Sequence, residues 1–74
     1  MAFNYSKLLG RIKECGMTQE SLAFAIGISA PTLNLKLNNK SAFTQKEMRN
    51  ISMKLEIPQT EIGAYFFTNE VQKN

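Results

Sequence analysis

The chain has 74 residues, which is enough for one domain with a modest hydrophobic core. Its net charge is +3, and it contains one cysteine and no histidine, which excludes an intramolecular disulfide and removes the usual ligands of zinc. No apolar run is long enough to span a bilayer, and the N-terminus lacks the layout of a signal peptide. We therefore expect a cytoplasmic protein with no metal, no cofactor and no membrane partner.

The apolar residues recur at helical rather than alternating spacing, so the chain is predicted to be all-α. Thr18, Ser29 and Thr44 are residue types preferred at helix N-caps, and Gly27 supplies the backbone freedom for a sharp turn. Glycines, prolines and a polar loop divide the chain into helices expected at about residues 6–15, 19–26, 29–37, 44–55 and 59–65.

One compact five-helix domain is expected over residues 1–67, and the polar residues 68–74 are expected to form a frayed tail. Gly10, in the middle of the first helix, is interpreted as a point where a neighbouring helix approaches closely. Each helix has an apolar stripe that can face a common core. The residues expected to face inward are Leu8, Leu9, Ile12, Leu22, Ile26, Leu33, Leu37, Met48, Ile51, Ser52, Leu55 and Ile62.

The excess of positive charge is confined to residues 29–49. That segment holds Lys36, Lys40, Lys46 and Arg49 against a single acidic residue, whereas acidic and basic residues balance in the rest of the chain. A polyanionic partner near the third helix would explain this distribution, and so would an ordinary solvated face.

Three segments carry a resemblance to a known family. They are the frame Thr18-Gln-Glu-Ser-Leu-Ala with Gly27-Ile-Ser, the stretch Thr32-Leu-Asn-Leu-Lys-Leu-Asn-Asn-Lys40 with Phe43-Thr-Gln-Lys-Glu47, and Ile62-Gly-Ala-Tyr-Phe-Phe67. Together they resemble the small Cro- and repressor-type regulators of the lambda-repressor-like helix-turn-helix family, in the short versions from phages and prophages of Gram-positive bacteria. The resemblance implies a five-helix bundle whose second and third helices form the helix-turn-helix. It also implies a transcriptional regulator that occupies a double-stranded DNA operator as a homodimer and has no small-molecule substrate.

The chain departs from the family pattern in the third helix. Lys36 stands at a position that is commonly apolar, which leaves open the exact register of the recognition face. Ala30 and Pro31 stand where many relatives carry long polar residues, and neither can form hydrogen bonds to a base.

On this interpretation, the side of the third helix opposite Leu33 and Leu37 enters the major groove. Asn34 is the candidate for base readout, because its amide matches the N6 and N7 edge of adenine. Gln19 resembles the family glutamine that reaches the sugar–phosphate backbone, and lysines add attraction to phosphates. The expected DNA-contacting residues are Gln19, Ser29, Ala30, Pro31, Thr32, Asn34, Leu35, Lys36, Asn38, Asn39, Lys40 and Lys46.

Two aromatic features admit two interpretations each. Phe24 either packs on the N-terminal arm near Phe3 or belongs to a partner surface. Tyr65, Phe66 and Phe67 either close the core or contribute to a dimer interface.

The second functional hypothesis is a protein-interaction module on the same fold, such as an antitoxin-like or antirepressor partner. It is motivated by Ala30, Pro31 and Leu35, which would give the third helix an apolar outer face. An enzyme is not expected, because the chain lacks a catalytic histidine, a cysteine pair, a glycine-rich phosphate loop and clustered carboxylates.

Overall fold

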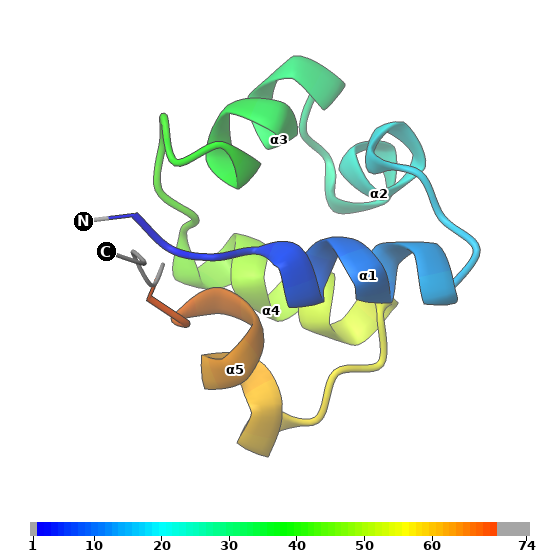
Figure 1. Cartoon of the computed structure of the whole chain (residues 1–74). Helices are drawn as coiled ribbons and strands as arrows, with labels where there is room; N and C mark the ends of the chain where they lie inside the picture. Colours follow the sequence, from blue (N-terminus) through cyan, green and yellow to red (C-terminus); the bar gives the residue numbers. More distant parts are fainter. Residues whose placement is uncertain (1, 70–74) are drawn as a thin grey trace.

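The computed structural model describes residues 2–69 (Figure 1). Its elements are α1 Ser6–Glu14, α2 Gln19–Ile26, α3 Ala30–Leu37, α4 Gln45–Lys54, the short 3-10 helix η1 Gln59–Glu61, and α5 Ile62–Phe66. The all-α prediction is confirmed, although the last helix is divided into η1 and α5. Within residues 2–69 the only β-pairing is an isolated bridge between Phe3 and Asn69, and no helix combines the length and hydrophobicity needed to cross a membrane.

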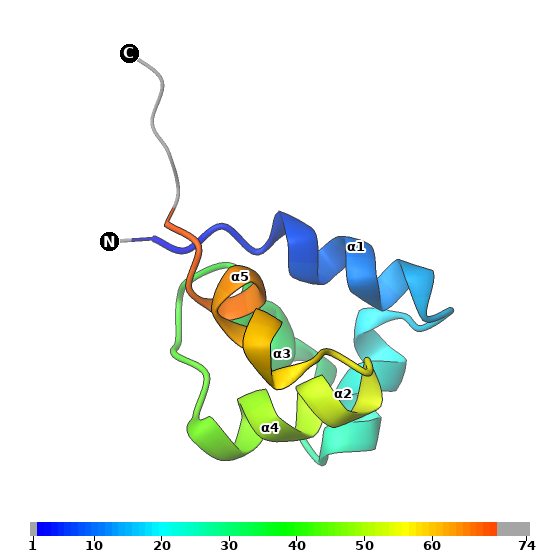
Figure 2. The same cartoon turned by 90° about the horizontal axis from the view of Figure 1, so that it is seen from below.

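The helices are arranged so that α1 and α4 lie between two other groups. The α2–α3 pair lies on one side of them and α5 lies on the opposite side (Figures 1 and 2). α2 contacts both α3 and α4, and α1 contacts α5. The outer surface of the α2–α3 pair and the surface around α5 therefore face opposite sides of the molecule.

Local capping signals set the starts of α2, α3 and α4. The hydroxyls of Thr18, Ser29 and Thr44 each accept a hydrogen bond from the backbone N–H three residues later, as expected for N-caps. Gly27 has φ 81°, a left-handed conformation that ends α2 and turns the chain toward the next cap. The predicted helix–turn–helix arrangement of α2 and α3 is thus built into the local sequence.

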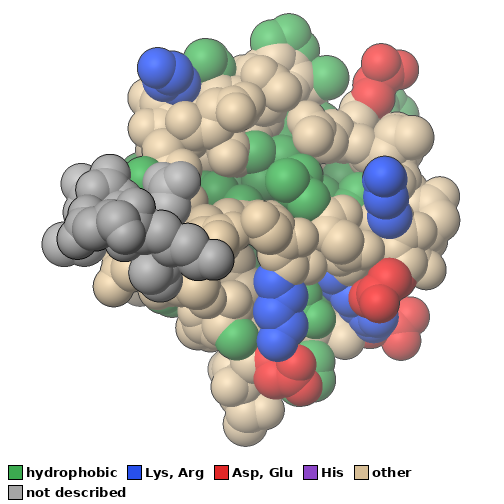
Figure 3. All heavy atoms as spheres, viewed as in Figure 1, with side chains coloured by type: hydrophobic (Ala, Val, Ile, Leu, Met, Phe, Trp, Pro, Cys, Tyr) green, Lys and Arg blue, Asp and Glu red, His purple; other side chains and the backbone are tan. Residues whose placement is uncertain are grey.

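The core is formed by apolar side chains from all five α-helices. Leu8, Leu22, Leu33 and Ile51 have no exposed surface, and truncating such a residue to alanine costs about 2–5 kcal/mol. Figure 3 shows further hydrophobic side chains between α1 and the α2–α3 pair. Leu9, expected to face inward, is instead 38% exposed. The buried apolar residues are Tyr5, Leu8, Ile12, Leu22, Ala23, Leu33, Leu37, Ile51, Leu55, Ile57, Tyr65 and Phe66.

Aromatic rings connect the N-terminal arm to the loop before α4 and to α5. The Tyr5 and Phe66 rings each meet the Phe43 ring edge-on, with centroids 5.4 Å apart in both pairs. Phe3 packs against Tyr5 and against Phe67, at centroid distances of 6.2 and 5.8 Å. The core-closing interpretation is confirmed for Tyr65 and Phe66, which are buried, whereas Phe67 is 51% exposed.

Backbone contacts also fasten the two ends of the chain together. The Asn4 N–H donates to the Thr68 carbonyl at 2.7 Å, beside the bridge between Phe3 and Asn69. The first two residues of the expected frayed tail are therefore held in place. The rest of that tail, residues 70–74, lies outside the described residues.

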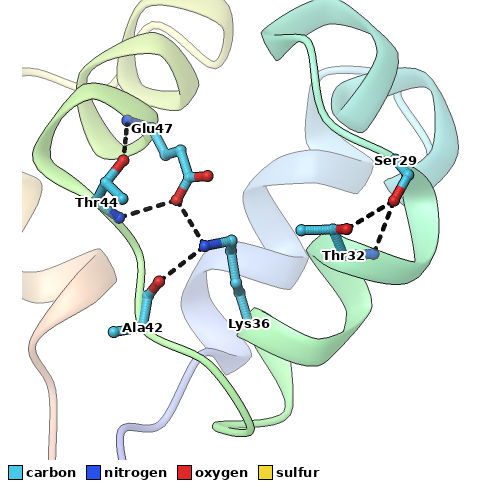
Figure 4. A network of polar contacts seen from close by, with 6 residues as sticks. All are labelled: Ser29, Thr32, Lys36, Ala42, Thr44 and Glu47. Carbon is cyan, nitrogen blue, oxygen red and sulfur yellow. Dashed lines mark hydrogen bonds and ion pairs between the residues drawn. The ribbon is translucent and has the colours of Figure 1, made fainter.

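Lys36 and Glu47 form an ion pair that joins α3 to α4. The Lys36 ammonium nitrogen lies 2.9 Å from Glu47 Oε1 and donates to the Ala42 carbonyl at 2.8 Å (Figure 4). Glu47 also accepts a hydrogen bond from the Thr44 N–H at 2.9 Å, which completes the capping box of α4. Burial alone would raise the pKa of the Glu47 carboxyl, but the Thr44 N–H and the Lys36 ammonium outweigh burial and lower this pKa below 4.5.

The lowered pKa of Glu47 makes stability depend on pH. Its contribution to the free energy of unfolding is complete above the unfolded value near 4.5 and is lost as pH falls through the lower folded value. We expect Glu47→Gln to reduce the free energy of unfolding at neutral pH by about 1–3 kcal/mol. The variant should also lose less stability than the parent on acidification. Urea denaturation at pH values above and below 4.5 measures both effects.

Glu14→Gln is the matched control for this experiment. Glu14 is 68% exposed and lies 3.5 Å from Arg11, so its replacement should change stability by less than about 0.5 kcal/mol. An acid sensitivity of Glu47→Gln equal to that of the parent would contradict the assignment.

Gly10 does not mark a close helix approach, because a Cβ built there meets no heavy atom within 4 Å. We expect Gly10→Ala to raise the free energy of unfolding by about 0.5–1 kcal/mol, since alanine reduces the entropy of the unfolded chain and favours the helix. Gly27→Ala should do the opposite, because its φ of 81° strains any side-chain-bearing residue. A Gly10→Ala variant that is less stable than the parent in a thermal or urea melt would contradict the absence of a close neighbour at Gly10.

Candidate functional site

The outward face of α3 is a stripe of four residues, Pro31, Asn34, Leu35 and Asn38, which we call the α3 stripe. Their spacing of three, four and seven residues places them on one side of the helix, and all four are exposed. Leu35 is 49% exposed. Ala30, which was expected on the same face, is instead half-buried and packs against the core.

Amide side chains along the stripe bond to one another. Asn34 Nδ2 lies 3.4 Å from Gln19 Oε1 on α2, which makes a long hydrogen bond. Asn38 Nδ2 donates to the Asn34 carbonyl at 2.8 Å and to Asn34 Oδ1 at 3.2 Å. Reading an adenine needs both the donor and the acceptor of one amide. Both polar ends of the Asn34 side chain are already engaged within the protein.

Ser29 and Thr32 are also occupied. The Ser29 hydroxyl caps α3 by accepting from the Thr32 N–H, and the two hydroxyl oxygens lie 2.7 Å apart (Figure 4). These hydrogen bonds give both side chains a structural role at the start of α3.

Lys36 is not on the outward face, and its assignment as a phosphate contact is corrected. It is 6% exposed, because it takes the commonly apolar position of α3 with its stem in the interior and its ammonium group paired with Glu47. Sequence reasoning left the register around Lys36 open and placed this lysine among the phosphate contacts, and charged residues rarely fill a core position. The signal that could have revealed its partner was the capping-box glutamate of the next helix.

Asn39 serves the fold as well. It has φ 62°, and its side chain accepts from the Phe3 N–H at 2.9 Å and donates to the Phe3 carbonyl at 3.0 Å. The paired amide contacts fix the N-terminal arm against the end of α3, which gives the Asn39 side chain a structural role.

Among the remaining cations of this region, Lys40 and Lys46 are exposed, and neither takes part in an ion pair within the described part of the chain. On the face seen in Figure 3, Lys and Arg side chains stand singly or beside acidic ones. A continuous basic strip of the kind that follows a phosphate backbone is not seen on that face.

Phe24 on α2 is 88% exposed, the largest exposed fraction among the large apolar side chains of the described region. The interpretation that it packs near Phe3 is wrong, because the Phe3 ring contacts Tyr5 and Phe67 instead. This ring is therefore not part of the core, and it is available to a partner.

Sequence reasoning missed Met53, a residue of α4 that is 71% exposed. Its position lies off the inward stripe that Met48, Ile51 and Leu55 form on α4. That offset is the signal that could have identified it as an apolar surface residue.

The family described as "Protein of unknown function (DUF739)" matches residues 1–69. Among solved structures, the chain is similar to the solution structure of the modulator of repression (MOR) of the temperate bacteriophage TP901-1 from Lactococcus lactis. The two share 39% identical residues with a TM-score of 0.78, over 97% of each chain. Comparison with curated proteins gives no match.

These findings correct the main functional prediction. The similar phage protein is described as a modulator of repression. The prediction of a Cro- or repressor-type protein that itself occupies an operator as a homodimer is therefore wrong, and the comparisons do not confirm membership of the lambda-repressor-like family. The residues assigned to DNA contact need other roles, several of which the hydrogen bonds above already supply. Because the family match spans nearly the whole chain, the chain belongs to the DUF739 family.

Proposed function

We propose that this chain modulates transcriptional repression by binding a repressor protein, not by reading operator DNA. The observation that carries the proposal is the match over 97% of both chains to a phage modulator of repression at 39% identity. At this level of identity and coverage, the two chains share their fold. A modulator needs a protein partner whose activity it changes.

The surface that suits this role best is the outer side of the α2–α3 pair. α2 displays Phe24, and α3 displays Pro31 and Leu35. Protein interfaces commonly have an apolar centre with aromatic anchors and a polar surround. Here the bonded amides of Gln19, Asn34 and Asn38 supply polar groups next to Pro31 and Leu35 on the α3 stripe.

The bonded amides also make this surface rigid before a partner arrives. The Asn38 side chain is fixed on the Asn34 backbone, and Asn34 reaches across to α2. A surface that is already ordered loses less side-chain entropy on association. The hydrogen bonds that occupy the Asn34 amide disfavour base recognition by this residue and favour its place in a protein interface.

Modulation follows from binding by thermodynamic linkage. If the chain changes the affinity of the repressor for its operator by some factor, the operator changes the affinity of the repressor for the chain by the same factor. This reciprocity gives the proposal a quantitative check that does not depend on whether repression is strengthened or weakened.

The test uses the purified chain, the transcriptional repressor from its own genome, and the operator duplex of that repressor. We expect the chain to bind the repressor in calorimetry and to change the amount of operator that the repressor occupies. Phe24→Ser should weaken binding to the repressor by at least about tenfold, since a buried aromatic anchor contributes about 2 kcal/mol or more. Its stability should stay near that of the parent, because the ring is 88% exposed in the free chain.

Met53→Ser is the matched control, since it removes another exposed apolar side chain from α4, away from the α2–α3 surface. It should leave affinity for the repressor unchanged. Direct binding of the chain alone to the operator duplex, with an affinity that falls steeply as salt is raised, would overturn the proposal.

A further inference from the structure

A second surface lies between α4 and the η1–α5 segment, on the other side of the molecule from the outer face of α3 (Figures 1 and 2). We call it the α4–α5 groove. Its volume is about 610 Å³, within the range of sites that accept small ligands or a few side chains. Its lining consists of Gln45, Met48, Arg49, Ser52, Met53, Ile57, Gln59, Ile62 and Phe67.

The walls of the groove display apolar side chains that the core does not use. Met53 on α4 is 71% exposed, and Phe67 after α5 is 51% exposed. They contribute two of the five large apolar side chains that are exposed in the described region. A hollow flanked by such residues marks an interaction site more often than a bare surface. Methionine also adapts its shape to different partners.

The charge of the groove is positive. Arg49 is exposed and lines it, and no carboxylate is among the lining residues. Neither ion pair of residues 2–69 includes Arg49. Lys46 is exposed one turn earlier on the same helix and adds to the potential. The nearby Glu56 and Glu61 are exposed without lining the groove.

Ser52 adds a polar feature to the groove lining. Its residue is 6% exposed, and its hydroxyl oxygen has no hydrogen-bond partner among residues 2–69. Buried polar atoms are nearly always bonded in native proteins, so an orphaned hydroxyl beside a hollow calls for an explanation. A polar group of an occupant would supply the missing partner after a small local adjustment.

From these observations we infer that the α4–α5 groove binds an acidic amphipathic helical segment of a second protein. Apolar side chains at a spacing of three or four residues fill the space between Met53 and Phe67, and an Asp or Glu of the segment meets Arg49. This is the helix-in-groove mode of recognition. A two-fold pairing of grooves from two copies of this chain is disfavoured, because neither groove has a lining carboxylate that could pair with the Arg49 of the other copy.

This inference does not rest on the proposed function, because it uses a different face of the molecule. Phe24→Ser tests the repressor surface and leaves the groove intact. Arg49→Glu and Met53→Gln test the groove and leave the α2–α3 surface intact. The two proposals can therefore fail separately.

The experiment is a selection of binders to the immobilised full chain from a displayed library of random peptides of about 16 residues, enough for four helical turns. We expect the selected peptides to carry apolar residues three or four positions apart together with Asp or Glu. In nitrogen-15 NMR titrations, they should shift the amide signals of Arg49, Met53, Gln59 and Phe67 more than those of α2 and α3.

Charge-reversed and polar variants complete the test. Arg49→Glu and Met53→Gln should each reduce the affinity of the chain for the selected peptides by at least about tenfold. Both residues are exposed, so circular dichroism should show unchanged folding. Lys13→Glu on α1 is the matched control, with the same change in net charge at an exposed site outside the groove. It should leave peptide affinity unchanged.

Three outcomes would overturn the inference. The first is a set of selected peptides that is not enriched in acidic residues. The second is an affinity that Arg49→Glu and Lys13→Glu reduce equally, since the effect would then come from net charge. The third is self-association of the parent chain in sedimentation equilibrium that Met53→Gln abolishes, which would make a second copy the occupant.

Discussion

The ion pair between Lys36 and Glu47 is the interaction on which the candidate surfaces depend. It stabilises the rotation of α3 that the burial of Leu33 and Leu37 also favours, because the stem of Lys36 lies in the interior beside them. That rotation decides which residues of α3 face outward. The pair is nearly buried, with side-chain exposures of 8% and 16%, and removing one partner of such a pair leaves an uncompensated charge. The same contact takes one cation out of the segment that holds the excess positive charge.

The outward face that results is unlike a DNA-reading face in two physical respects. A recognition helix needs free hydrogen-bond donors and acceptors at the positions that meet base edges. Here the exposed amides bond to each other, and their neighbours Pro31 and Leu35 are apolar. Attraction to phosphates needs several free cations near the helix ends, and the pairing of Lys36 with Glu47 leaves Lys40 and Lys46 as the exposed lysines of this region. The exposed chemistry of this helix pair therefore differs from that of a DNA-reading face, although its arrangement is that of a helix–turn–helix.

The sequence allowed much of the fold to be predicted, because the relevant signals are local. Thr18, Ser29 and Thr44 cap their helices, and Gly27 adopts the left-handed conformation that its place between two helices required. The side of α3 that holds Leu33 followed from spacing alone. Lys36 could not be placed in this way, because its burial depends on a carboxylate from another helix. Phe24 was left between two interpretations and Met53 was not singled out, because spacing along a helix does not show which apolar side chains the core leaves exposed. The functional prediction failed for a different reason. The residues that carried the resemblance specify the helix pair, and a helix pair does not specify its partner.

α4 links the two candidate surfaces, because it is tied to α3 and also lines the groove. Glu47 in its first turn is tied to α3, while Arg49, Ser52 and Met53 in its later turns line the groove against α5. A ligand shifts a conformational equilibrium only by its difference in affinity for the two states. An occupant that contacts side chains already displayed in the groove has no reason to prefer a displaced α4. Displacing α4 would also separate Lys36 from Glu47 and leave both charges poorly solvated. The ion pair therefore favours occupation of each surface without a change at the other.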